Sequence, residues 1–245
     1  MRINIRKFFN KIMELNYRYL FSRSIVRNEY KSTVYISKNS AIINSTIYVT
    51  SGSTLIIGEN CILKNLNLYV KGKVILDKNN IIDSGYGISK LDLFVDGNFI
   101  LGSFNRLRSK IWVRFNAKLQ IGNHNNINED SEIRCDESVT IGHYNQISYK
   151  CMIWDTNTHN IYADDKRREL TDQFFPIFGY EFEKPKTKPV TIGNDCWIAR
   201  EVAVLKGVIL QNAVVVGFRT TLSNCEIISN KVVVPKIENS IYDRI

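Results

Sequence analysis

The chain of 245 residues has little of several residue types that often mark a function. It contains only four prolines, three histidines and three methionines, and its five cysteines include no Cys-x-x-Cys pair. No apolar run approaches the ~18 residues of a membrane span. These absences argue against a membrane-spanning protein and against a disulfide framework. We therefore expect a cytoplasmic protein, whose 44% hydrophobic residues suffice for a substantial core.

Aliphatic residues recur with a period that neither a helix nor an ordinary strand produces. The clearest run has one residue in every six and comprises Ile192, Ile198, Val204, Leu210, Val216 and Leu222. A triangular coil of three short strands, each about six residues long, explains this period, and such coils stack into a parallel β-helix. The sequence therefore predicts an all-β solenoid over residues 31–245.

A longer repeat aligns six segments of the chain on one column. Its anchors are Ile57, Leu76, Leu101, Ile121, Ile141 and Ile192. A glycine follows five of these anchors, and we expect it to supply positive φ at the corners. The last two anchors lie 51 residues apart, whereas a strict coil has about 18. We assign the excess to a loop inserted at residues 160–189, which holds three of the four prolines.

The N-terminus carries most of the net positive charge. Residues 1–31 contain eight Lys or Arg against two Glu, whereas the rest of the chain has 25 basic and 22 acidic residues. Helical spacing of apolar residues predicts an amphipathic helix over 3–27, within an N-terminal unit of residues 1–30. Two interpretations remain open: the helix caps the end of the solenoid, or residues 1–27 rest peripherally on the inner membrane face. The body has no basic run with interleaved aromatics, so we expect no nucleic-acid partner.

Two segments resemble the hexapeptide-repeat acyltransferases, the left-handed β-helix family. Residues 192–208, IGNDCWIAREVAVLKGV, are similar to the IGxxxWIGxxxxxLxGV segment of bacterial sugar and polysaccharide O-acetyltransferases. Residues 155–162 are similar to the Asp-x-x-x-His-x-Ile-Tyr segment of the same enzymes. The resemblance covers roughly residues 50–237.

The resemblance implies a homotrimeric left-handed β-helix that uses acetyl-CoA as its acetyl donor. The acceptor would be a hydroxyl of a bacterial surface polysaccharide, capsular or O-antigen, or of its sugar precursor. The transfer would be direct, because a neutral histidine can take the hydroxyl proton without a covalent enzyme intermediate. The alternatives are an N-acyltransferase acting on an amino-sugar nucleotide and a non-catalytic β-helix scaffold.

The resemblance also implies roles for individual residues. His159 stands at the position of the catalytic base, and Asp155 would orient its ring, with a backbone carbonyl or Asn157 as the alternative orienter. The substrate site would include Trp197 and Asn157. Trp197 should face outward beside the next subunit, where trimer packing is the other interpretation.

Coenzyme A in this family lies in the groove between two parallel solenoids. The resemblance places Ala199 and Gly217 along that groove. It places Lys236 at the adenine end, in the segment that stands for the family's Gly-Asn-Pro-Ala signature. We expect no metal, because the other two histidines, His124 and His143, should lie at surface corners away from the catalytic one.

Three cysteines fit the same repeat. Cys61, Cys151 and Cys196 each follow a repeat isoleucine by four residues. This position points inward in the family and takes a small residue, so we expect buried apolar side chains rather than reactive thiols.

Overall fold

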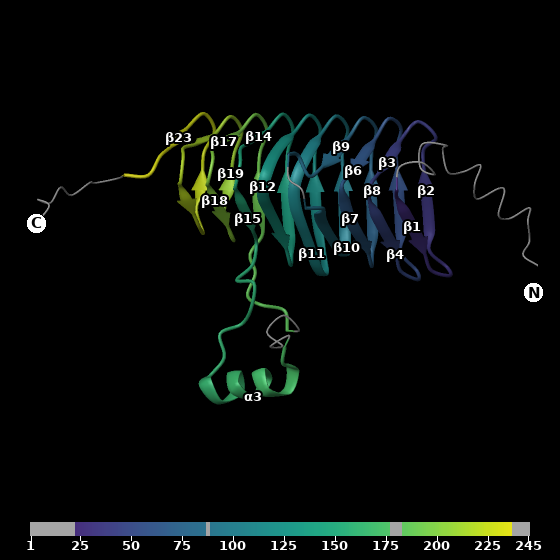
Figure 1. The fold of residues 1–245 in the computed structure, drawn as a ribbon. Coiled ribbons are helices and arrows are strands. Elements are labelled where there is room, and N and C mark those ends of the chain that lie inside the picture. The colour runs from purple at the N-terminus through teal and green to yellow at the C-terminus, as the bar shows by residue number, and fades with distance from the viewer. Residues whose placement is uncertain (1–22, 87–88, 177–182, 237–245) are drawn as a thin grey trace, which may run out of the picture.

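The computed structural model describes residues 23–86, 89–176 and 183–236. These residues form a parallel β-solenoid of about 10 coils and one short helix, α3 (Asp164–Phe174) (Figure 1). Strands of successive coils pair in parallel along the whole solenoid. The fold class predicted from the six-residue period is therefore confirmed.

Pairing sorts the strands into three faces, which we call A, B and C. Face A contains β2 (Thr33–Ile36), β5 (Thr54–Ile57), β8 (Lys73–Leu76), β13 (Ser138–Ile141), β16 (Val190–Ile192), β19 (Ile209–Leu210) and β22 (Glu226–Ile227). Face B contains β3 (Ala41–Ile43), β6 (Ile62–Lys64), β9 (Ile81–Asp83), β14 (Gln146–Ile147), β17 (Trp197–Ile198), β20 (Val215–Val216) and β23 (Val232–Val233). Face C contains β1 (Ile25–Asn28), β4 (Thr46–Val49), β7 (Leu66–Val70), β15 (Met152–Trp154), β18 (Ala203–Leu205) and β21 (Thr221–Leu222). The long strands that turn corners and serve more than one face are β10 (Leu91–Leu101), β11 (Arg106–Ile121) and β12 (Asn126–Cys135).

The predicted column of anchors is confirmed on face A. The six anchors pair in register with one another from β5 to β16, and all are buried. The column continues to Ile36 at one end and to Leu210 and Ile227 at the other. Each fully buried aliphatic side chain stabilises the fold by roughly 1.5–3 kcal/mol relative to exposure, so a continuous column holds the coils together.

The glycines after the anchors serve a different purpose from the predicted one. The expectation of positive φ is wrong for Gly58, Gly102, Gly122, Gly142 and Gly193. A Cβ on Gly122 would lie 2.5 Å from the carbonyl oxygen of Gly142, so the next coil leaves no room for a side chain. Positive φ belongs instead to the residue two positions later, for example His124 at 60° and Tyr144 at 59°.

A ladder of buried asparagines joins the coils at the corner between faces A and B. The backbone N–H of Asn125 donates to Oδ1 of Asn105 at 2.8 Å, and that of Asn145 donates to Oδ1 of Asn125 at 2.9 Å. The ladder begins at Asn80 and ends where Asn145 Oδ1 accepts the N–H of Cys196 at 2.8 Å. Buried polar groups are costly without partners, and each amide here supplies partners for the next coil.

The solenoid begins earlier than residue 31. Strand β1 pairs with β4, so Ile25–Asn28 forms part of the first coil and replaces the end of the helix expected over 3–27. Residues 1–22 lie outside the described part of the chain, so the capping and membrane interpretations stay predictions. Among the residues that the structure describes, no helix has the length and apolar character needed to cross a membrane.

The inserted segment leaves the corner between β15 and β16 and projects away from the solenoid (Figure 1). It is not only a loop, because it contains the 11-residue helix α3. Asp164 and Asp165 lie in the first turn of α3, where negative charge favours the helix dipole. None of the residues of α3 is buried, and isolated helices shorter than about 12–15 residues are marginal in water. Packing against a further surface would therefore stabilise this helix.

The asparagine ladder gives a prediction about stability. Asn125→Ala removes the oxygen that accepts both the N–H and the side-chain amide of Asn145. We expect the free energy of unfolding in urea to fall by about 1–3 kcal/mol, the usual cost of leaving a buried donor unpaired. The control is Asn126→Ala, which alters an outward-facing neighbour and should change stability by no more than about 0.5 kcal/mol. Equal losses in the two variants would contradict this role of the ladder.

Candidate active site

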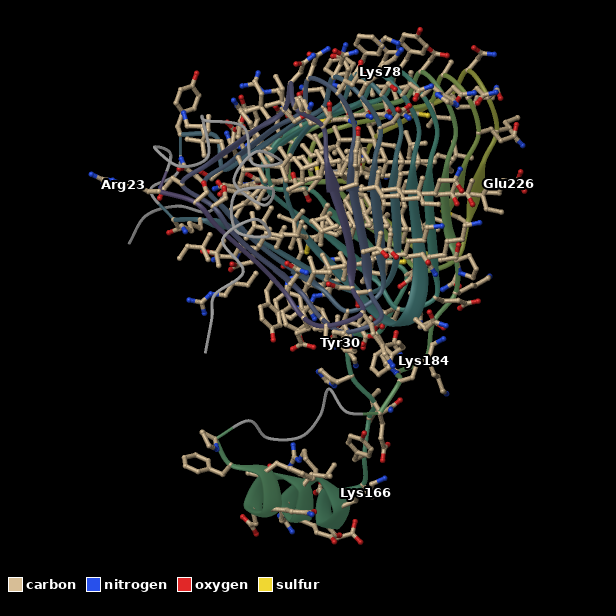
Figure 2. The ribbon with its side chains drawn as sticks, turned by 90° about the vertical axis from the view of Figure 1, so that its right-hand side faces the viewer. Arg23, Tyr30, Lys78, Lys166, Lys184 and Glu226 are labelled. Carbon is tan, nitrogen blue, oxygen red and sulfur yellow. The ribbon has the colours of Figure 1, made fainter. Side chains whose placement is uncertain are left out.

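The inserted segment leaves the solenoid through a neck of two chain segments. An antiparallel bridge pairs Thr156 with Thr187. The N–H of Asn157 donates to the carbonyl of Lys186 at 3.0 Å. Figure 2 shows this neck running from the solenoid to the helix that carries Lys166. The two segments thus brace each other where the chain leaves the repeat.

A buried ion pair holds the base of the neck. Arg114 donates from Nε to Asp136 Oδ1 at 2.8 Å and from Nη2 to Oδ2 at 2.6 Å, and Asp136 is fully buried. Thr156 Oγ1 donates to Asp136 at 2.6 Å and accepts the N–H of Thr158 at 3.0 Å. Arg114 Nη2 also donates to the carbonyl of Thr158 at 3.2 Å. This network fixes the chain up to the residue before His159.

Asp155 does not orient His159, contrary to the expectation. Its carboxylate is fully buried and accepts the backbone N–H groups of Asp136, Glu137 and Ser138 at 2.7–2.8 Å. Burial raises the pKa of the Asp155 carboxyl, and the three N–H groups partly offset that rise. The carboxylate therefore closes the corner of the preceding coil instead of holding the histidine.

His159 follows the neck directly and is exposed. Its Nδ1 lies 3.2 Å from the carbonyl oxygen of Asn160. A carbonyl oxygen can only accept, so this contact requires a proton on Nδ1 and leaves Nε2 of the neutral ring unprotonated. The partner of Nδ1 in this contact is a backbone carbonyl, which is one of the alternatives left open by the sequence.

Asn157 is exposed on the same segment, two residues before His159. Its side-chain oxygen accepts a hydrogen bond of 2.6 Å from Nζ of Lys206, which follows β18 in the next coil. The contact brings a cation to the base of the neck. Asn157 therefore links the inserted segment to the solenoid beside the candidate base.

Trp197 faces outward, as predicted, and 56% of it is exposed. It lies on face B, in register with Gln146 and Val215. The neck leaves the corner between faces C and A, which is the corner opposite face B. A single chain therefore does not bring Trp197 and His159 together.

Ala199 and Gly217 stack on each other at the corner between faces B and C. Their N–H groups donate to carbonyls of the following coil at 2.9 and 2.7 Å. A Cβ on Gly217 would lie 2.6 Å from a methyl group of Val234, which covers this position. The corner thus offers small side chains, but the N–H groups of these two residues are already used. Lys236 is the last described residue of the C-terminal segment.

Three residues that hold the neck were not predicted from the sequence, namely Arg114, Asp136 and Thr156. These residues form one column at the corner after face C, because β11, β12 and β15 pair in register there. Extending the coil alignment from face A to this corner would have placed an arginine, an aspartate and a threonine side by side. That alignment is the signal that could have found the anchor of the neck.

Three of the cysteines and the other two histidines occupy buried or corner positions of the described coils. Cys61, Cys151 and Cys196 are buried, as predicted, and burial raises the pKa of each thiol, which keeps it protonated near neutral pH. His124 and His143 are exposed at corners. In the described part of the chain, no three His, Cys, Asp or Glu side chains gather as a metal site requires.

Comparison with known proteins yields similar structures but no family model and no curated protein that matches. The polysialic acid O-acetyltransferase OatWY is 22% identical, over 89% of this chain and 93% of its own, with a TM-score of 0.37. The polySia-specific acetyltransferase NeuO is 16% identical, over 86% of this chain and 74% of its own, with a TM-score of 0.33. The UDP-N-acetylglucosamine O-acyltransferase LpxA of Moraxella catarrhalis is 11% identical, over 80% of this chain and 67% of its own, with a TM-score of 0.29. These values are low, so the activity has to be inferred from the residues of this chain.

The buried ion pair generates a prediction about the neck. Asp136→Asn leaves Arg114 without its counter-charge, and we expect the free energy of unfolding in urea to fall by about 3–5 kcal/mol. The control is Glu201→Gln, which breaks the exposed pair of 2.7 Å with Arg219 and should leave the unfolding midpoint unchanged. If both variants unfold at the same urea concentration, the pair does not anchor the neck.

Proposed function

We propose that the chain is an acyltransferase that moves an acetyl group from acetyl-CoA to a hydroxyl of a bacterial surface polysaccharide or of its sugar precursor. The observation that carries the proposal is the presentation of His159. A general base must be held in place and yet be reachable by substrate, and the braced neck with its exposed imidazole provides both. The resemblance of residues 155–162 and 192–208 to segments of O-acetyltransferases agrees with this assignment.

The chemistry follows from the tautomer. With its proton on Nδ1, the ring of His159 can accept the hydroxyl proton of the acceptor at Nε2 while the hydroxyl oxygen attacks the thioester carbonyl. The tetrahedral intermediate then collapses, the carbon–sulfur bond breaks, and the imidazolium returns the proton to the leaving thiolate. The products are an acetyl ester and free coenzyme A, and no covalent enzyme intermediate is formed. Asn157 is included in the proposal as a contact to the acceptor.

Acetyl-CoA is assigned to the corner between faces B and C. Ala199 has a small side chain and Gly217 has none, so a thin pantetheine arm could lie across that corner. Lys236 would contact the adenine end. Because the N–H groups of Ala199 and Gly217 bond to the next coil, contacts there would be van der Waals or would use other polar groups. Hence we propose that these two residues shape the surface on which acetyl-CoA lies and do not donate hydrogen bonds to it.

A homotrimer is part of the proposal. Trp197 and His159 lie on opposite sides of one solenoid, so a site that uses both needs two chains. The projecting helix α3 has no buried residue and would gain packing from a neighbour. Closed cyclic symmetry repeats such a shared site at every contact between subunits.

The His159→Ala variant tests the proposed chemistry. Acetyl transfer should fall by roughly 10²–10⁴-fold, the usual loss for a general base, with the KM for acetyl-CoA little changed. The assay is mass spectrometry of products from a panel of acceptors. The panel includes polysialic acid, which is named as the substrate of two of the similar proteins, together with capsular and O-antigen oligosaccharides and an amino-sugar nucleotide. Acetylated amine instead of ester would identify an N-acyltransferase.

Controls separate this base from other groups. His124→Ala changes an exposed corner histidine and should retain activity. Cys196→Ser should also retain most activity, because burial raises the pKa of that thiol and no thiolate is required. An active His159→Ala protein beside an inactive Cys196→Ser protein would indicate a covalent acyl-enzyme. Equal amounts of product from all variants would contradict the assignment of His159 as the general base.

The oligomer gives a separate prediction. Multi-angle light scattering at micromolar concentration should report three chains per particle, and deletion of residues 163–176 should weaken the assembly because it removes the projecting helix. The same deletion should leave the solenoid folded, since α3 buries nothing in its own chain. A fully active monomer would refute the shared site.

A further inference from the structure

Outward side chains on face C line up across the coils in one continuous row. In-register pairing places together Arg27, Tyr48, Tyr69, Phe94, Trp112, Arg134 and Trp154. We call the residues from Tyr48 to Trp154 the aromatic row. Tyr69 stacks on Tyr48 at 5.5 Å and on Phe94 at 5.3 Å between ring centroids. The guanidinium of Arg134 lies between Trp112 and Trp154, at 5.6 and 5.3 Å from their ring centroids.

A groove of about 360 Å³ runs beside the first part of this row, across β4, β7, β10 and β11. Its apolar side is formed by Tyr48, Tyr69, Phe94 and Trp112. Its polar side is formed by the residue two positions earlier on three of these strands, Thr46, Asn67 and Asp92. Asn67 Nδ2 donates to Asp92 Oδ1 at 2.9 Å, so the polar side is also continuous from coil to coil.

We infer that this groove, the glycan groove, binds the acceptor as an extended chain of sugars. A sugar ring has an apolar C–H surface and a rim of hydroxyls, which match one aromatic and one hydrogen-bonding wall. Because the rings of the row stack on one another, the ligand would meet their edges, while hydroxyls would bond to Asn67 and Asp92. The inference rests on the proposed function and narrows it, since it makes the acceptor a polymer rather than a single activated sugar.

The geometry of the groove argues against a helical peptide and against an added β-strand. Its two walls are side chains at positions i and i+2 of a strand, about 6.5–7 Å apart. An α-helix with side chains is roughly 10–12 Å across and would not enter. An added β-strand is also excluded, because the strands of face C already pair with the coils on both sides.

The row leads from the groove to the candidate active site. Trp112 lines the groove, and Trp154 lies two strands further on, roughly 10 Å at the usual strand spacing. Trp154 is followed directly by Asp155, where the segment that carries His159 leaves the solenoid. A glycan held in the groove and extended along the row therefore arrives at the neck.

The test measures binding of the same glycan panel, each polymer beside its own disaccharide, by calorimetry without acetyl-CoA. The protein is the full chain with His159→Ala, so that no turnover occurs. One groove variant carries Tyr69→Leu and Phe94→Leu, which keep apolar bulk, and a second carries Asn67→Ala and Asp92→Ala on the polar wall. The matched control is Tyr35→Leu, a 60% exposed tyrosine on face A.

We expect at least one polymer to bind more tightly than its disaccharide. Its affinity should fall roughly 3- to 10-fold in each groove variant, the range for the loss of aromatic contacts in the first and of hydrogen bonds in the second, and remain unchanged in the control. The inference is overturned if no polymer exceeds its disaccharide or if both groove variants bind as the parent does. A changed subunit number by light scattering in the second variant would also overturn it, since face C would then be a contact between copies.

The two proposals can fail separately. Polymer binding that depends on the groove, in a protein that never acetylates any acceptor, would contradict the proposed function and leave the glycan groove in place. Acetylation that requires His159 but proceeds with equal KM for polymer and disaccharide in every groove variant would contradict the groove and leave the proposed function.

Discussion

The structure depends on one constraint: each coil must repeat the shape of its neighbour so that N–H groups on one coil meet carbonyls on the next. This parallel pairing runs from β1 to β23, with register shifts between Val95 and Gly97 and between Leu107 and Ser109. A misplaced side chain would separate two coils and weaken bonds on more than one face. The constraint explains the buried aliphatic columns, the lack of room for a side chain on Gly122, and the asparagines that bond to one another at a corner.

The same constraint decides where chemistry can be placed. Within the repeat the backbone N–H and carbonyl groups bond to neighbouring coils, and the side chains lie at fixed spacings. The excursion between β15 and β16 is released from the repeat, yet the Arg114–Asp136 pair and Thr156 hold its base to the solenoid. A rigid scaffold that carries an irregular functional segment is a common arrangement. Asp155 and His159 illustrate this difference between repeat and excursion. The carboxylate of Asp155 accepts N–H groups at a corner of the preceding coil, whereas His159 is exposed.

The repeat could be predicted from the sequence because many weak signals agreed. Six anchors defined face A, and the excess of residues between the last two located the projecting segment and its histidine. The role of Asp155 could not be predicted in the same way. Proximity in sequence suggested His159, four residues away, but the partners of its carboxylate are N–H groups 17–19 residues earlier, one coil away. The prediction of positive φ for the glycines was wrong for the same reason, because contacts between coils determine these angles.

The aromatic row has a consequence that goes beyond its individual side chains. Each coil contacts only its neighbours, so a solenoid can gain or lose a coil without altering distant ones. One coil more or less between β4 and β11 would change the length of the row by one strand spacing, about 4.8 Å, and leave the neck as it is. The coils ahead of His159 therefore form an adjustable ruler. In such a protein the number of repeats, more than the identity of any residue, would set how long a ligand the surface can measure.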